Sequence, residues 1–343
     1  MKRMKDMNVL LTSAGRRSYL VKYFKEAVGA SGRVVVSNSA VSQAFAAADR
    51  AVVSPVIYDG GYIPFLLNLC REEKIGLLVS LFDIDLPVLS AHKREFEDIG
   101  VTVAVSDPEV IGICNDKWRT YGFLTENSFS APKTYVSLEA AKNAIKAGDI
   151  GWPVMVKPRW GMGSLAIYRA DNERELEIFY DKTRNNIKET YLKYEAAQAP
   201  EECVLIQQWI DGQEYGMDVI NNLDGSYQNV VQKRKEAMRS GETDSAVTVE
   251  IPALREIGER ISGLLRHRGN LDMDLFEKDG QFYVLELNAR FGGGYPFSHL
   301  AGVNLPKALV EWSCGREPDP ELLKAEAGVR GYKDICLIRL DQE

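Results

Sequence analysis

Three oxygen-bearing side chains near the end of the sequence are spaced so that they could hold a divalent cation. Glu286 and Asn288 lie two positions apart in one apolar run, which puts both on the same face of a strand. Asp274 lies in the preceding run, and Asp279-Gly280 between the runs predicts a hairpin that makes the two strands neighbours. Mg²⁺ bound to nucleotide phosphates needs a few such oxygen ligands. Asp274, Glu286 and Asn288 are therefore the predicted metal ligands, and an inert polar hairpin face is the alternative.

An arginine and a run of glycines follow these residues directly. Arg290 continues the two-residue period of Glu286 and Asn288, so we expect it on their side of the strand. A guanidinium there suits the charge that develops on a transferring phosphoryl group or an acyl-phosphate oxygen, which makes Arg290 a predicted catalytic residue. The glycines at 292–294 could form an anion nest, or only a flexible turn.

Two lysines earlier in the chain are candidates for binding phosphate. Lys157 ends the strongly apolar run 152–157 and stands beside a glycine-containing loop, which fits a clamp over ATP phosphates. Because this lysine precedes the glycines, the segment is not a P-loop. Lys117 can supply a second cation, although either lysine alone could equally be a solvated surface charge.

The segment 207–215 offers a place for a nucleotide base and its sugar. A strand ending in a short polar loop provides backbone N–H and C=O groups for an adenine edge, and apolar side chains beside them. The Glu214 carboxylate can accept hydrogen bonds from both ribose hydroxyls. Without the other motifs, this segment would be read only as a strand and a turn.

These motifs, in this order, resemble the ATP-grasp superfamily, and most closely the single ATP-grasp unit of carbamoyl-phosphate synthase large subunits and related carboxylate–amine ligases. The resemblance extends from Asn8 to about Ala308, and its most specific part is Asp274 with Glu286-x-Asn288-x-Arg290. It implies ATP and Mg²⁺ as cofactors, with Mn²⁺ as a substitute. It also implies that Lys117 and Lys157 bind phosphate, that Lys157 and Arg290 act in catalysis, and that Glu214 binds ribose. The implied lid residues are Gly161, Gly163 and Ser164, and the implied adenine-binding linker is Gln207, Gln208, Trp209 and Ile210.

Two departures from the family pattern affect the expected substrate. The chain has one ATP-grasp unit and no visible glutaminase region, so synthesis of carbamoyl phosphate is not expected. Asp274 stands where Glu or Gln is common, which could shift the metal. The stretch 233–243, with four basic residues, falls where related ligases contact substrate. It predicts contact with an anionic substrate or the ATP γ-phosphate, and a solvated basic loop is the alternative.

The first hundred residues alternate short apolar runs with segments of helical period. Strands are expected at 8–12, 33–37, 51–53, 77–81 and 101–105, and helices at 17–28, 63–73 and 86–99. This alternation predicts a parallel sheet with helices on both faces, whose ligands gather at the carboxyl ends of the strands. Two loops at those ends are candidates. Arg16 and Arg17 could hold an anion or lie in solvent, and Asp83 and Asp85 could contact a substrate amine or serve as cap and loop residues.

The resemblance implies the fold class for the rest of the chain. We expect an α/β pre-ATP-grasp domain at 1–112, followed by two α+β lobes of an ATP-grasp fold. These are a lid or small lobe at 113–209 and a C-terminal catalytic lobe at 210–343. In the second half, further strands are expected at 152–157, 165–168, 203–209, 215–221, 271–276 and 282–287, and helices at 172–192 and 253–266.

Composition restricts the partners and the compartment. The 343 residues carry a net charge of −7, which argues against general binding to nucleic acid or a membrane surface. The five cysteines are far apart and odd in number, which favours a reducing compartment over a disulfide framework. The apolar segment after the basic start is only three residues long, so a secretion signal is not expected. We expect a cytoplasmic protein that binds small-molecule carboxylate and amine substrates, with a homodimer as one open oligomeric state.

The predicted reaction joins a carboxylate to an amine, or to a thiol, through an acyl phosphate, with release of ADP and phosphate. Such chemistry depends on positioning and charge neutralisation, in keeping with three histidines that belong to no motif. Two alternatives stay open. One is a non-catalytic ATP-binding or regulatory protein. The other is a dinucleotide-dependent oxidoreductase, against which the missing glycine fingerprint counts.

Overall fold

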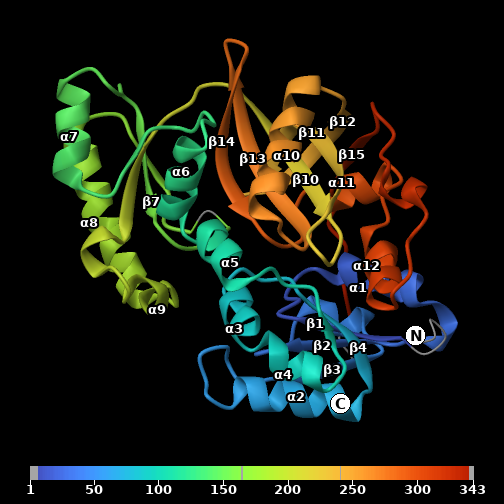
Figure 1. The fold of residues 1–343 in the computed structure, drawn as a ribbon. Coiled ribbons are helices and arrows are strands. Elements are labelled where there is room, and N and C mark those ends of the chain that lie inside the picture. Colours follow the sequence, from blue (N-terminus) through green and yellow to red (C-terminus); the bar gives the residue numbers. More distant parts are fainter. Residues whose placement is uncertain (1–6, 164, 240, 340–343) are drawn as a thin grey trace.

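A computed structural model describes residues 7–163, 165–239 and 241–339 of the chain (Figure 1). Its first sheet has the strand order β3-β2-β1-β4-β5, and all its strands are parallel. The strands are β1 (Asn8–Thr12), β2 (Val34–Asn38), β3 (Arg50–Val53), β4 (Ile75–Ser80) and β5 (Thr102–Val103). Its helices are α1 (Ser18–Val28), α2 (Tyr62–Glu72), α3 (Asp85–Ala91) and α4 (Lys93–Asp98). We call this the parallel sheet.

Both faces of the parallel sheet are covered, as the near-continuous apolar strands require. Val9 and Leu11 of β1 face a core that includes α1 and α12 (Leu305–Ser313). Leu10, between them, faces the opposite core, which is made with α2, α3 and α4. The prediction of a parallel α/β unit with helices on both faces is confirmed.

A second sheet has the order β6-β9-β7-β8 and its own hydrophobic core. We call it the small sheet. Its strands are β6 (Thr134–Tyr135), β7 (Val154–Pro158), β8 (Tyr168–Ala170) and β9 (Val204–Gln208). Helices α7 (Leu138–Lys146), α8 (Glu173–Glu189) and α9 (Leu192–Ala196) accompany it, on the left of Figure 1. Asn172 caps α8 through its side chain, and this places the helix start where the sequence predicts it.

The third sheet is antiparallel, with the order β14-β13-β10-β11-β12-β15. We call it the large sheet. Its strands are β10 (Gln213–Asn221), β11 (Tyr227–Arg239), β12 (Glu242–Val249), β13 (Gly269–Lys278), β14 (Gln281–Asn288) and β15 (Arg330–Tyr332). Helix α10 (Pro252–Leu265) covers one face, where Met217 and Met273 join its core, and α11 (Tyr295–Leu300) follows the last long strand. The opposite face carries the polar residues of the site described below.

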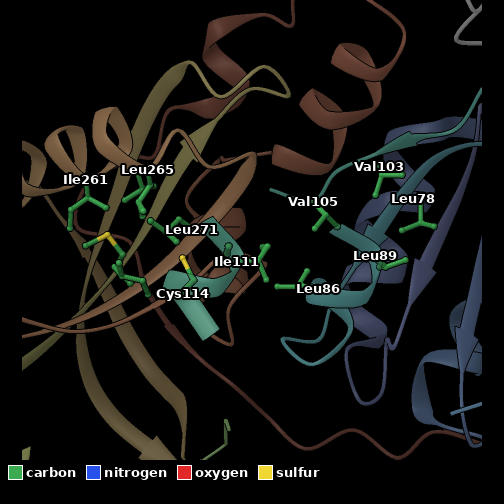
Figure 2. Close-up of a cluster of buried hydrophobic side chains, with 14 of the residues drawn as sticks. Leu78, Leu86, Leu89, Val103, Val105, Ile111, Cys114, Ile261, Leu265 and Leu271 are labelled. Atoms are coloured by element: carbon green, nitrogen blue, oxygen red, sulfur yellow. The ribbon is translucent and has the colours of Figure 1, made fainter. Parts of the chain in front are cut away.

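Two helices join the parallel sheet to the two others. They are α5 (Pro108–Asn115) and α6 (Lys117–Glu126), and both contact β14. Figure 2 shows Ile111 and Cys114 of α5 between Leu86 of the parallel sheet's helices and Leu271 of the large sheet. One apolar core therefore runs through α5 from one sheet to the other, and it fixes the carboxyl ends of the parallel strands against the large sheet.

The remaining described helices are short 3-10 turns at Gly29–Ser31, Gln43–Ala47, Pro200–Glu202 and Pro320–Leu323. In the described part of the chain, every helix is too short or too polar to cross a lipid bilayer.

Several predicted elements differ from those observed. The single helix expected at 86–99 is two helices, separated at His92. The strand expected at 101–105 is only Thr102–Val103, and the one at 165–168 begins at Tyr168. The strands β11 and β12 were not predicted, and the reading of 233–243 as a solvated basic loop is wrong for the described residues, because they belong mainly to this strand pair. Charged side chains hid the strand pattern of β11, since Lys233 and Lys235 point into a polar cavity rather than into solvent.

Candidate active site

The hairpin of β13 and β14, which we call the acidic ribbon, brings the predicted metal ligands together. Asp274 pairs directly with Glu286, and Asp272 pairs with Asn288. All four side chains line one cavity of about 230 Å³ on the face of the large sheet opposite α10, which we call the acidic cavity. The predicted convergence of Asp274, Glu286 and Asn288 is therefore present in the geometry, and Asp272 is a fourth member that sequence reasoning missed.

A β-bulge in β14 produces this alignment. Leu275 pairs with Val284, but the next pair is Asp274 with Glu286, so Leu285 is an extra residue. Val284 and Leu287 both face the hydrophobic core although they are three positions apart, and Glu286 between them faces the cavity. Without the bulge, Glu286 would pair with Met273 and point into the core.

Lysines from β11 form another wall of the cavity. The Lys235 ammonium group lies 2.6 Å from Asp274 and 2.7 Å from Glu214. Lys233 is 2% exposed and pairs with the buried Asp218, and its Nζ also donates to Ser298 at 2.9 Å. Both lysines of this basic stretch alternate onto the cavity face, and its contact with an anionic substrate or the ATP γ-phosphate stays a prediction.

The pKa values of Asp274 and Glu286 are shifted in opposite directions. Burial raises the pKa of Asp274, and the nearby carboxylates of Glu286 and Glu214 raise it further against the opposing effect of Lys235. Burial would also raise the pKa of Glu286, but Lys117, Lys157 and Arg290 outweigh it and lower the pKa. Two carboxylates held face to face repel each other, and a cation between them removes that cost.

The donor set fits Mg²⁺ shared with phosphates better than a metal held by protein alone. Among the described residues, no three His, Cys, Asp or Glu side chains gather closely enough to hold an ion. The predicted set is two carboxylates and one amide, and Mg²⁺ commonly takes one or two carboxylates and completes its octahedron with phosphate oxygens and water. The role of Asp274, Glu286 and Asn288 as metal ligands stays a prediction on this basis.

The two lysines predicted to bind phosphate both lie near Glu286, and that role stays a prediction. Lys117 begins α6, donates to the Gly161 carbonyl at 2.6 Å, and lies 3.8 Å from the Glu286 carboxylate. Lys157 is buried in β7 and donates to Gln207 at 2.7 Å. Burial lowers the pKa of Lys157 to about 8, and the positive charge of Lys117 lowers it in the same direction.

The predicted lid loop lies between β7 and β8. Gly161 and Gly163 both have positive φ, and both line cavities next to Lys117 or the acidic ribbon. The third predicted residue of the loop, Ser164, lies outside the described residues. The loop therefore reaches the site from the small sheet, opposite the β13–β14 ribbon.

The predicted adenine-binding linker has mixed contacts. Gln207 joins Lys157 to Thr134 through its side-chain amide, and the Gln208 side chain accepts from the backbone of Lys133. The Trp209 ring packs under the Arg169 guanidinium at 5.2 Å, and Ile210 is buried. Only Gln207 of these four touches a predicted phosphate-binding residue, so the adenine-binding role of the linker stays a prediction. So does the ribose-binding role of Glu214, whose carboxylate pairs with Lys235.

Arg290 connects the parallel sheet to the acidic ribbon. Its guanidinium lies 3.0 Å from both the Asp83 and the Asp272 carboxylates, and it lines the cavity with Glu286 and Asn288. Burial would lower the pKa of Arg290, but the carboxylates of Asp83 and Asp272 raise it overall. The following Gly292 is required here, because a Cβ at this position would overlap the Asp272 carboxylate.

The two candidate loops of the parallel sheet make different contacts. Asp85 is fully buried and accepts hydrogen bonds from Thr12, Ser80 and Tyr62, so it ties the strand ends together. Arg16 and Arg17 both line the acidic cavity, and Arg17 donates to the Phe291 carbonyl at 2.6 Å. The arrangement presents two more guanidinium groups to whatever anion enters the cavity.

Comparison with known families decides the assignment. The profile of the ATP-grasp domain matches residues 114–294, which is more than half of the chain. The chain belongs to the ATP-grasp family. A second profile, described as the PylC-like N-terminal domain, matches residues 9–104, the part that forms the parallel sheet. The predicted ATP-grasp fold behind an N-terminal α/β unit is confirmed. The exact domain limits at 112 and 209 stay predictions.

Relatives of this ATP-grasp protein are much longer. The carbamoyl phosphate synthase large chain of Methanosarcina mazei is 24% identical over 291 residues, which cover 80% of this chain and 25% of that protein. The large chain of Archaeoglobus fulgidus is 25% identical over 289 residues, 81% of this chain and 25% of that one. The ATP-grasp chain therefore spans about a quarter of the length of these curated relatives.

Solved structures share the fold at low sequence identity. The L-amino acid ligase of Bacillus licheniformis superposes with a TM-score of 0.70 at 18% identity, covering 97% of this chain and 82% of that one. The N5-carboxyaminoimidazole synthetase of Staphylococcus aureus, complexed with ADP, gives 0.70 at 13% identity, covering 91% and 78%. The biotin carboxylase domain of the Hydrogenobacter thermophilus 2-oxoglutarate carboxylase, in complex with MgADP and bicarbonate, gives 0.69 at 19%, covering 91% and 70%.

Proposed function

We propose that this protein is a Mg²⁺- and ATP-dependent ligase that activates a carboxylate as an acyl phosphate and transfers the acyl group to an amine. The observation that carries the proposal is the ribbon of β13 and β14, where Asp274 faces Glu286 in a cavity whose other walls carry lysines and arginines. Membership of the ATP-grasp family and the ADP-bound relatives support it. A thiol acceptor would use the same first half-reaction.

The residues of the site divide the work of the first step. Lys117 and Lys157 would hold the ATP phosphates, and Asp274, Glu286 and Asn288 would hold Mg²⁺. When bound, Mg²⁺ offsets phosphate charge. A substrate carboxylate oxygen attacks the γ-phosphorus in line, the bond to the β-phosphate oxygen breaks, and ADP leaves. Arg290 lies where negative charge would accumulate on the reacting groups.

The second step needs an amine and the exclusion of water. The amine nitrogen attacks the acyl carbon, the bond to phosphate oxygen breaks, and phosphate leaves while the nitrogen loses a proton. Water would hydrolyse the acyl phosphate, so the loop that carries Gly161 and Gly163 would have to cover the site during the reaction.

An assay with a chemical trap tests this function. The protein is incubated with Mg-ATP and a panel of carboxylic acids, and hydroxylamine converts any acyl phosphate into a hydroxamate that can be measured together with ADP. We expect ADP and hydroxamate in equal amounts with one class of acid. Tight binding of Mg-ATP without ADP formation for any acid would favour a regulatory nucleotide-binding protein, and stabilisation by NAD(P)H but not Mg-ATP would favour an oxidoreductase.

A further inference from the structure

A second cavity adjoins the acidic one, and its chemistry differs. It has a volume of about 190 Å³ and lies between the loop after β4, helix α5 and the small sheet's loop and α9. Ile84, Pro87, Ile111 and Trp160 give it an apolar wall. Asn288 lines both cavities, so the two are separated by little more than one side chain.

The polar atoms left unsatisfied beside this second cavity are acceptors. Asp83, which is 7% exposed, lines it, and its Oδ1 has no hydrogen-bond partner among the described residues. The Oδ1 of Asn115 is also buried without a partner in that part of the chain, while its Nδ2 donates to the Asp83 carbonyl at 2.6 Å. A buried carboxylate oxygen without a donor is costly, so a ligand that brings N–H groups would relieve that cost.

Two cations line the same wall, and each has a protein partner. Lys117 donates to the Gly161 carbonyl, and Arg119 lies 2.6 Å from Glu109. Glu195, on the α9 side, accepts from the Tyr58 hydroxyl at 2.8 Å. The buried atoms that lack a partner, Asp83 Oδ1 and Asn115 Oδ1, are both acceptors, and an ammonium group, with three donors and no acceptor, complements them.

We propose that this second cavity binds the amine substrate, a primary amine with an apolar substituent, and that Asp83 is its binding residue. The inference rests on the ligase function proposed above. Arg290 holds the Oδ2 of Asp83 through two nitrogens at 3.0 Å. An amine at Oδ1 would thus stand one carboxylate away from the guanidinium that lines the acyl-phosphate site, which is where a nucleophile has to wait.

Two variants of the full-length protein address the cavity in different ways. Asp83→Asn removes the charge that attracts the ammonium group. Gly112→Leu adds a side chain to the cavity wall, and the nearest atoms to its Cβ belong to the flexible Arg119 guanidinium. Gly122→Leu is the matched control, since Gly122 lies in the neighbouring helix α6 and a Cβ there meets nothing within 4 Å.

Calorimetric titration with n-butylammonium chloride tests the proposal without ATP or an acid, so its failure is distinguishable from failure of the ligase assay. We expect saturable binding to the wild type, at least tenfold tighter than for 1-butanol, and unchanged by saturating Mg-ADP. Asp83→Asn and Gly112→Leu should each weaken it at least tenfold, and Gly122→Leu less than twofold. Absence of saturable binding, competition by Mg-ADP, or equal affinity in Gly112→Leu and the wild type would overturn the assignment.

Discussion

The Glu286 carboxylate is surrounded by several positively charged side chains. Lys117 lies 3.8 Å from it, and Lys157 and Arg290 also lower its pKa. We expect Glu286→Gln to lower the rate of ADP formation by about 100-fold or more, because a neutral amide both weakens the hold on Mg²⁺ and leaves three cations uncompensated. The hydroxamate assay at increasing Mg²⁺ concentration measures this.

Glu277→Gln provides the comparison for that variant. Glu277 lies on the same ribbon near the turn and accepts from the Gly280 N–H, which a glutamine oxygen can also do. Its rate should stay within about twofold of wild type, as expected for a surface substitution. An unchanged rate in Glu286→Gln would refute the metal role of Glu286.

The buried Lys157 predicts a pH dependence of nucleotide binding. Burial and the neighbouring Lys117 lower the pKa of Lys157 to about 8, while Glu286 acts in the opposite direction. Lys157 therefore loses its proton, and its attraction for phosphate, as the pH rises through about 8. We expect the dissociation constant of Mg-ADP to be constant below pH 7 and to rise by up to about tenfold per pH unit above 8.

Lys157→Arg tests the cause of that dependence, because a guanidinium stays charged throughout the range. Its dissociation constant for Mg-ADP, titrated from pH 6.5 to 9.5, should lose the rise above pH 8. A flat profile in the wild type would contradict the assignment of Lys157 to the phosphates.

Most of the site residues could be predicted from spacing, and the exceptions have physical reasons. Glu286, Asn288 and Asp274 are recognisable because a hairpin makes alternate residues neighbours. Asp272 follows from the same rule, two positions before Asp274, and could have been found. The pairing of Arg290 with Asp83 could not, since Asp83 reaches it from another sheet across more than two hundred residues of sequence.

At the scale of elements, one buried polar network holds β10, β11, β13 and α11 in register. Asp218, which is 0% exposed, accepts from Lys233, from Ser298 at 2.5 Å and from Asn270 at 2.7 Å. Hydrogen bonds of this kind are strong in a buried site, and removing one member leaves its partners without a bond. It supports the strands directly behind the acidic cavity.

Lys233→Met should destabilise the protein by about 3–5 kcal/mol, because it leaves the Asp218 charge buried without its cation. The double variant Lys233→Met with Asp218→Asn should recover part of that loss, as the amide has no charge to compensate. Urea unfolding followed by circular dichroism gives both values. A loss in the double variant equal to the sum of the losses in Lys233→Met and Asp218→Asn, measured in the same way, would show that the pair is not coupled.

The strand pair β11–β12 shows why some elements are harder to predict than others. β10 and α10 have clear apolar periods, and their predicted positions agree with the structure to within a few residues. The half of β11 that faces the cavity alternates lysines with partly exposed residues, and this resembles a polar loop. Its character depends on acidic partners from β10 and β13, which local sequence does not reveal.

At the scale of the whole molecule, the parallel sheet and the small sheet touch through a small aromatic contact. Tyr58, in the loop after β3, stacks on Tyr194 of α9 with ring centroids 4.1 Å apart and donates to Glu195. This contact lies at the α9 side of the second cavity, of which Glu195 is a wall residue. The position of this cavity wall therefore depends on the contact between α9 and Tyr58.

Tyr58→Ala should make the backbone of α9 exchange its amide hydrogens about 3–10-fold faster, since a stacked pair contributes about 0.5–1.5 kcal/mol. Tyr58→Phe, which keeps the ring and removes the hydroxyl, should show a smaller increase. Hydrogen exchange followed by mass spectrometry over residues 192–196 measures both. Equal exchange in all three proteins would mean that α9 is held by other contacts.

Only the family resemblance predicts how the three sheets pack against one another. Strand–helix alternation predicts the parallel sheet, whose register follows from buried apolar strands. The path of the core through α5, with Ile111 and Cys114 between two sheets, depends on contacts between residues far apart in the chain (Figure 2). Long-range packing of this kind leaves little trace in local composition.

The extra residue of the β-bulge, Leu285, affects how this site can be found in other sequences. Counting back from the turn at Asp279-Gly280 without a gap would set Glu286 against Met273, a residue of the core. A search pattern for the acidic pair must therefore allow one inserted position between the turn and the glutamate. By the same count, a strand that lacked Leu285 would still set its glutamate against Asp274, so sequences with and without the inserted residue can carry the same acidic pair.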